Sequence, residues 1–214
     1  MQALARQMGL TKAEEVQLRK LSTPRKIQDF LDTIPMNHEK NGETYKSPRL
    51  VLLDRKAHCM EGALLAAAAL WLQGEKPLLM DFRTDHRDED HVVALYRVNG
   101  LWGAISKTNH AILRFRDPVY RTLRELALSY FHEYFLFDTG AKTLRAYSRP
   151  FDLRRFGADW VTTEDNLYPL AVAIDDSPHY DLVPRKNIPH LRPADRMELS
   201  HGQYIEWKKS DART

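Results

Sequence analysis

A run of small apolar residues constrains the fold of this chain more than any other segment. Residues 63–72 read ALLAAAALWL, and Gly74 follows shortly after them. This pattern predicts a helix that begins at Cys59 and ends near Gln73. Because alanine side chains make this helix thin and its composition is almost wholly apolar, we expect it to be buried. The run has about half the length that a bilayer crossing needs, so it predicts a core helix of a globular domain.

The clearest local structure in the sequence is a β-hairpin. Residues 91–98 (HVVALYRV) and 101–107 (LWGAISK) are strand-like, and the Asn99-Gly100 pair between them is typical of a two-residue type I′ turn. Residues 77–83 are a further expected strand. We therefore predict an α+β fold in which the helix from Cys59 packs on an antiparallel sheet.

Capping residues and apolar periodicity indicate the other elements. They predict helices at 11–21, 23–34 and 122–135. Residues 36–56 are expected to form a long loop, because they contain turn signals such as Ser47-Pro48. Weaker patterns at 142–147 and 168–174 are interpreted as strands.

These elements suggest three parts of the chain. We expect an N-terminal helical extension at 1–22 and a core at 23–140. Residues 141–214 are expected to be a C-terminal extension that completes or covers the core.

Composition excludes several classes of protein. The 214 residues carry a formal net charge of +3, too small an excess to indicate a nucleic-acid partner. A single cysteine excludes an intrachain disulfide framework and a cysteine-rich zinc site. The first residues lack the unbroken apolar core of a signal peptide. We expect a cytoplasmic protein with no membrane partner, no cofactor and no bound metal, while the oligomeric state stays open.

The position of the cysteine suggests a nucleophile. Cys59 opens the predicted helix, and the partial positive charge and unpaired N–H groups of a helix N-terminus lower the pKa of a thiol. A lone cysteine is often only a small buried apolar residue. A catalytic one needs a general base within hydrogen-bond reach, and that base needs an orienting partner.

The hairpin register predicts which residues could be that base and its orienting partner. His91 starts the first hairpin strand, so it lies at an end of the sheet. With Asn-Gly as the turn, the numbers of paired residues sum to 199, which puts His91 opposite Thr108 and diagonal to Ser106 on one face. A bulge after Ser106 would bring Asn109 to the imidazole. The candidates for orienting His91 are therefore Ser106, Thr108 and Asn109, in that order.

This order of features resembles the transglutaminase-like branch of the papain-like cysteine hydrolase superfamily. That branch has a cysteine at a helix start, then a His-Ala-Trp-Val-type strand and a Gly-Trp-x-x-x-Asp segment. The matching pieces are Cys59, residues 91–94 (HVVA) and residues 101–106 (LWGAIS). The match of Trp102 places Ser106 where the family has its aspartate.

The resemblance implies a papain-like, transglutaminase-like fold and cysteine-dependent acyl transfer. Cys59 would attack the carbonyl of an amide or peptide bond, and His91 would take and return the proton. The acyl group would pass to water or to an amine, and the substrate would be a peptide, a protein or a small amide. An oxyanion hole would combine the Cys59 N–H with a side-chain donor, for which Gln28, Asn37 and Asn41 are candidates.

Two alternatives stay open. Serine at position 106 carries no charge to stabilise an imidazolium, so a catalytically silent binding module on the same fold is one alternative. The other is a metal-dependent hydrolase that uses His86, Asp88 and His91, although a solvated acidic loop is the simpler interpretation of that segment.

Two polar residues near Cys59 in the sequence are predicted to have structural roles. His58 is expected to be a loop or helix-cap residue, because adjacent residues do not face each other on a helix. Glu61 is expected to stabilise the helix dipole from the first turn.

Overall fold

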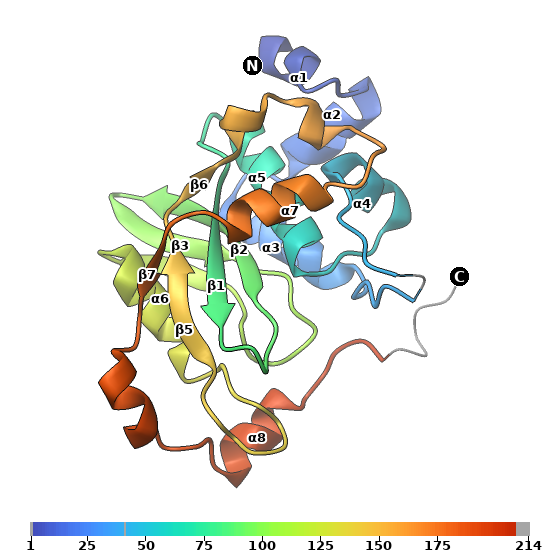
Figure 1. Ribbon diagram of the computed structural model, residues 1–214. Coiled ribbons are helices and arrows are strands. Elements are labelled where there is room, and N and C mark those ends of the chain that lie inside the picture. The colour runs from blue at the N-terminus through green and yellow to red at the C-terminus, as the bar shows by residue number, and fades with distance from the viewer. Residues whose placement is uncertain (1, 41, 209–214) are drawn as a thin grey trace.

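The helix that begins at Cys59 lies against an antiparallel sheet at the centre of the molecule (Figure 1). The computed structural model describes residues 2–40 and 42–208. Helix α5 (Cys59–Leu72) contacts strand β2 (His91–Val98), and all of its residues except Cys59 and Trp71 are buried. The predicted α+β class and the predicted buried helix are therefore confirmed.

The strands of the described residues form one sheet, in the order β4-β3-β2-β1-β5-β7 with β6 also paired to β1. Every pairing in it is antiparallel. The strands other than β2 are β1 (Leu78–Thr84), β3 (Leu101–Ile105), β4 (Arg116–Tyr120), β5 (Leu144–Ser148), β6 (Phe151–Asp152) and β7 (His179–Asp181).

The hairpin register agrees with the prediction. Asn99 and Gly100 have φ angles of 50° and 84°, as a type I′ turn requires. Val98 pairs with Leu101, and the same register continues to the pair of Ala94 with Ile105.

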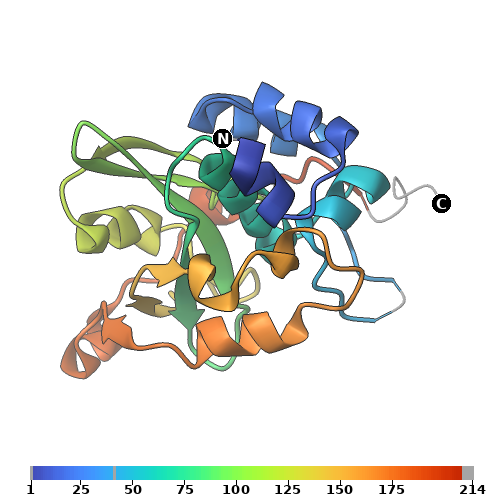
Figure 2. The same cartoon turned by 90° about the horizontal axis from the view of Figure 1, so that it is seen from above.

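Helices cover both faces of the sheet. Helix α5 packs on one face together with α2, α3, α4 and α7, and α6 packs on the other face (Figure 2). Their bounds are α2 (Lys12–Lys20), α3 (Pro24–Thr33), α4 (Pro48–Asp54), α6 (Leu123–Phe131) and α7 (Tyr168–Asp175), with α1 (Gln2–Gln7) and α8 (Arg196–Gly202) at the two ends. Short 3-10 helices lie at Leu153–Phe156, Asp159–Val161 and Arg185–His190.

Two predictions about elements are wrong, and each error has a local cause. The expected loop at 36–56 contains α4, because Ser47 caps that helix by accepting a hydrogen bond from the Leu50 N–H and Pro48 fills its first turn. The expected strand at 168–174 is helix α7, whose buried residues Leu170 and Ile174 have the helical i, i+4 spacing.

A third difference lies at the end of the helix predicted at 122–135. Helix α6 ends at Phe131, and Phe135 instead forms an isolated bridge with Lys142. The chain after residue 140 contributes β5, β6 and β7 to the sheet. No helix in the described part of the chain is long and apolar enough to cross a membrane.

A buried lysine joins the end of the hairpin to the N-terminal helices. Lys107 is 1% exposed, and its Nζ donates to the carbonyls of Leu31 and Ile34 at the end of α3. Burial lowers the pKa of Lys107 to about 8. A Cβ added at Gly62, in the first turn of α5, would collide with the Cβ of Lys107. Gly62 therefore allows the segment after β3 to lie directly against the start of the Cys59 helix.

We expect Gly62→Ala to destabilise the protein. Alanine alone would favour the helix by about 1 kcal/mol. The collision with the Lys107 Cβ is expected to cost about 3 kcal/mol, the upper end of the range for overpacking, so the net loss is about 2 kcal/mol. Denaturant unfolding of the two proteins measures the difference. A variant as stable as the wild type would show that this contact does not restrict the start of α5.

Candidate active site

Cys59 is the first residue of α5 and stands between two hollows in the surface. It is only partly buried. One hollow, of about 320 Å³, is lined by Cys59, His91 and Tyr134 among others. The other, of about 640 Å³, is lined by Cys59, His58 and Tyr45 among others. Cys59 therefore borders both hollows.

His91 is held in a defined tautomer by Ser106. Its Nε2 lies 2.8 Å from the Ser106 hydroxyl oxygen, and that hydroxyl lies 2.5 Å from the carbonyl oxygen of Leu113. A carbonyl only accepts, so Ser106 donates to Leu113 and accepts from the His91 Nε2–H. Nδ1 is then the ring nitrogen that is free to exchange a proton with Cys59.

His58 also faces Cys59, which the sequence did not predict. Its Nδ1 lies 4.0 Å from the Cys59 sulfur, and its Nε2 donates to the carbonyl of Thr44 over 2.6 Å. His58 is the N-cap of α5, as expected, but its backbone is extended, with φ −94° and ψ −173°. Side chains of adjacent residues point apart inside a helix. Because His58 is a cap residue with an extended backbone, its side chain can point toward that of Cys59.

The two imidazoles govern the charge of Cys59. Burial acts to raise the pKa of the thiol, but hydrogen bonding to His58 and His91 and their positive charges hold that pKa well below its usual range. Burial acts to lower the pKa of His58, but the Cys59 thiolate and the charge of Glu61 raise it to about 9. The arrangement therefore favours a thiolate paired with imidazolium at neutral pH.

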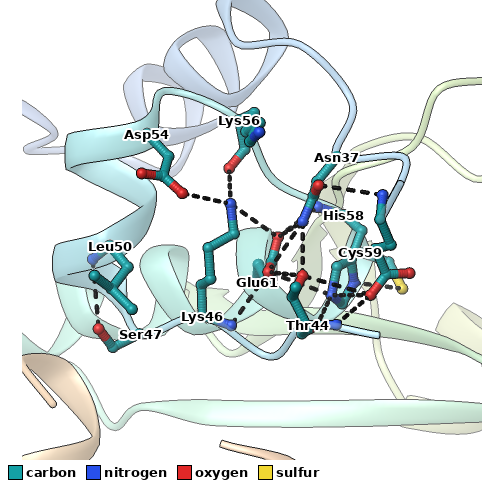
Figure 3. A network of polar contacts seen from close by, with 11 residues as sticks. Asn37, Thr44, Lys46, Ser47, Leu50, Asp54, Lys56, His58, Cys59 and Glu61 are labelled. Carbon is teal, nitrogen blue, oxygen red and sulfur yellow. Dashed lines mark hydrogen bonds and ion pairs between the residues drawn. The ribbon is translucent and has the colours of Figure 1, made fainter. Parts of the chain in front are cut away.

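Hydrogen bonds to the Glu61 side chain join the loop that contains Thr44 and Lys46 to the start of α5 (Figure 3). The Glu61 side chain is fully buried and accepts hydrogen bonds from the His58 N–H at 3.0 Å, the Thr44 hydroxyl at 2.9 Å and the Lys46 N–H at 3.1 Å. The Asn37 amide also donates to it. Because Thr44 orients the His58 ring, Glu61 fixes both the cap and the imidazole.

The other residues considered for orienting His91 have different partners. The Asn109 side chain makes two 2.8 Å hydrogen bonds to the backbone of Trp207. The Thr108 hydroxyl accepts from the His110 N–H. Both residues line the 320 Å³ hollow, but only Ser106 is hydrogen-bonded to His91.

The expected side-chain donors of an oxyanion hole are occupied. Gln28 donates to the Ser106 carbonyl at 2.8 Å and accepts from the Ser106 N–H at 3.0 Å, so it positions Ser106. The Asn37 amide nitrogen donates to Thr44 and Glu61. Asn41 lies outside the described residues.

The acidic segment before β2 offers no clear metal site. Among the described residues, possible ligand atoms converge at Asp81, Asp90 and Asp175, and His86, Asp88 and His91 do not form such a group. Asp81 already accepts from His179 at 2.9 Å, and Asp175 pairs with Arg83 at 2.9 Å.

No protein-family model matches this chain, and no curated protein matches it in sequence. The transglutaminase-like assignment therefore stays a prediction.

Alkylation by iodoacetamide tests how the two imidazoles share control of Cys59. We expect the wild type to react at pH values well below about 8.5, where an ordinary thiol is mostly protonated. His91→Ala and His58→Ala should each shift the rate profile to higher pH. Reaction only above that pH, or profiles unchanged in both variants, would contradict the thiolate–imidazolium arrangement.

Ser106→Ala should weaken the site through His91. It leaves the His91 Nε2–H and the Leu113 carbonyl without their shared partner, which we expect to lower the free energy of unfolding by about 1–3 kcal/mol. It should also slow alkylation of Cys59, because the tautomer of His91 is no longer fixed. Ser148→Ala is a matched control, since Ser148 is fully buried and hydrogen-bonded to the Asp81 N–H and the Arg149 carbonyl. Equal alkylation rates in Ser106→Ala and Ser148→Ala would argue against an orienting role.

Proposed function

We propose that this chain is a cysteine-dependent acyl-transfer enzyme that acts on amide or peptide bonds. Cys59 is the nucleophile, His91 the general base and acid, and Ser106 orients His91. The observation that carries the proposal is that Cys59 opens a helix, interacts with two imidazoles and lines two hollows. Nucleophilic cysteine enzymes need this combination of a lowered thiol pKa, a base and access for substrate.

The first half of the reaction forms an acyl-enzyme. The Cys59 thiolate attacks the substrate carbonyl carbon, a C–S bond forms, and the carbonyl electron pair moves onto the oxygen. When that pair returns, the C–N bond breaks, and the amine leaves with a proton from His91. The product on the enzyme is a thioester of Cys59.

The second half releases the acyl group. His91, now neutral, takes a proton from water or from an amine that attacks the thioester, and Cys59 leaves as a thiolate. Water gives hydrolysis and an amine gives transamidation. In this scheme His58 stabilises the thiolate through its Nδ1, which lies 4.0 Å from the Cys59 sulfur, while its Nε2 donates to the Thr44 carbonyl.

The fold that we propose for this reaction is papain-like, of the transglutaminase-like type. Two features agree with this fold. Cys59 begins a buried helix that packs on an antiparallel sheet, and His91 begins strand β2 of that sheet. The departure is Ser106, where that family has an aspartate. A hydroxyl can fix the tautomer of His91, but it stabilises an imidazolium less than a carboxylate does.

The same departure supports a second candidate, a binding module that has lost catalysis. Such a protein would keep the geometry of Cys59 and His91 without turning over substrate. Acylation and turnover separate the two candidates.

Reaction with p-nitrophenyl acetate tests the proposed function. We expect a burst of p-nitrophenol, followed by slower turnover, and a protein mass increased by one acetyl group per chain. Cys59→Ser should abolish the burst, and His91→Ala should slow it by about 10²-fold or more, whereas His58→Ala should slow it less. Release of p-nitrophenol no faster than in Cys59→Ser would exclude the enzyme and leave the binding module.

A further inference from the structure

The oxyanion of the proposed reaction lacks an evident side-chain donor. As the first residue of α5, Cys59 has a backbone N–H without an intrahelical partner, which supplies one donor. Acyl-transfer sites typically aim more than one donor at the developing charge. Gln28 and Asn37 are both committed to other partners. A second donor is therefore to be sought among groups that line the hollow beside Cys59.

Tyr134 is such a group. It lines the 320 Å³ hollow with Cys59 and His91, and only 3% of its surface is exposed. Its hydroxyl is buried and has no hydrogen-bond partner within the described part of the chain. An unpartnered buried hydroxyl costs stability, so its presence on a residue that lines the hollow points to a partner that arrives with a ligand.

The surroundings of Tyr134 keep its hydroxyl protonated and able to donate a hydrogen bond. Its ring packs edge-on against Phe82, with 6.3 Å between ring centroids. Burial raises the pKa of the hydroxyl, and the negative charges of Asp81 and Cys59 add to that shift. The hydroxyl therefore lies within the field of the Cys59 sulfur and stays protonated, which makes it a donor throughout the neutral range.

We propose that the Tyr134 hydroxyl donates a hydrogen bond to the substrate carbonyl oxygen in the 320 Å³ hollow, as a second donor beside the Cys59 N–H. This role rests on the acyl transfer proposed above. As the Cys59 sulfur bonds to the carbonyl carbon, the oxygen gains the electron pair of the C=O bond. Tyr134 keeps its proton, and its hydrogen bond strengthens as the charge develops. Tyr134 would then be a catalytic residue that acts on the oxygen, while His91 acts on the leaving group.

The test compares Tyr134→Phe with Tyr130→Phe in the full chain. Tyr130 is a matched control, because it is also fully buried but its hydroxyl donates to the Arg114 carbonyl at 2.9 Å. With p-nitrophenyl acetate we expect Tyr134→Phe to lower kcat by about 10²-fold, with little change in KM, and Tyr130→Phe to leave both near wild-type values.

Two further readouts separate this role from a structural one. Alkylation of Cys59 by iodoacetamide builds no oxyanion, so Tyr134→Phe should leave its rate unchanged. The variant should also unfold at the same or a higher denaturant concentration, because the lost hydroxyl has no partner.

Each other outcome overturns the proposal. If the wild type turns over the ester and Tyr134→Phe does so equally fast, the role of Tyr134 is wrong and the acyl-transfer function stands. If Tyr134→Phe slows alkylation as much as turnover, or unfolds more easily, its role is structural. If the wild type itself forms no acetyl-enzyme, the proposed function and this inference fail together.

Discussion

The pairing of the Cys59 sulfur with two imidazoles is the interaction on which the rest of the site depends. A thiol in a partly apolar setting resists ionisation, and only nearby positive charge reverses that tendency. His58 and His91 supply it from opposite sides, one from the helix cap and one from strand β2. Each ring is fixed from behind by a neutral oxygen, which is the Thr44 carbonyl for His58 and the Ser106 hydroxyl for His91. Both rings thereby keep Nδ1 available to the sulfur, and the Nδ1 of His58 lies 4.0 Å from it.

The core keeps these groups in place. Helix α5 is buried along its length, and Gly62 brings Lys107 and the end of the hairpin against its first turn. Glu61 closes the other side by holding the loop with Thr44. A buried polar network of this kind is rigid only when all of its members are satisfied. The unpartnered hydroxyl of Tyr134 therefore stands out beside it.

Local sequence patterns predicted much of the fold and, in the candidate site, the positions of Cys59, His91 and Ser106. The Asn99-Gly100 turn fixed the strand register, and the register placed Ser106 first among three candidate partners of His91. The sequence did not predict that His58 and Tyr134 belong to the candidate site, and the physical reason differs between them. His58 is adjacent to Cys59 and converges on it only because the cap residue is not helical. Tyr134 follows helix α6, far along the chain, and tertiary packing alone brings it to the hollow. A Ser-Pro pair that starts a helix also looks like one that makes a turn, which is why α4 was missed.

The most direct measurement of the central claim is a pH titration of the ultraviolet absorbance of the thiolate. Because Cys59 is the only cysteine of the chain, a difference spectrum against Cys59→Ser reports this one sulfur. We expect the thiolate absorbance to be present already at neutral pH and to disappear only well below the ordinary thiol pKa of about 8.5. A single titration step at or above that ordinary value would contradict the central claim.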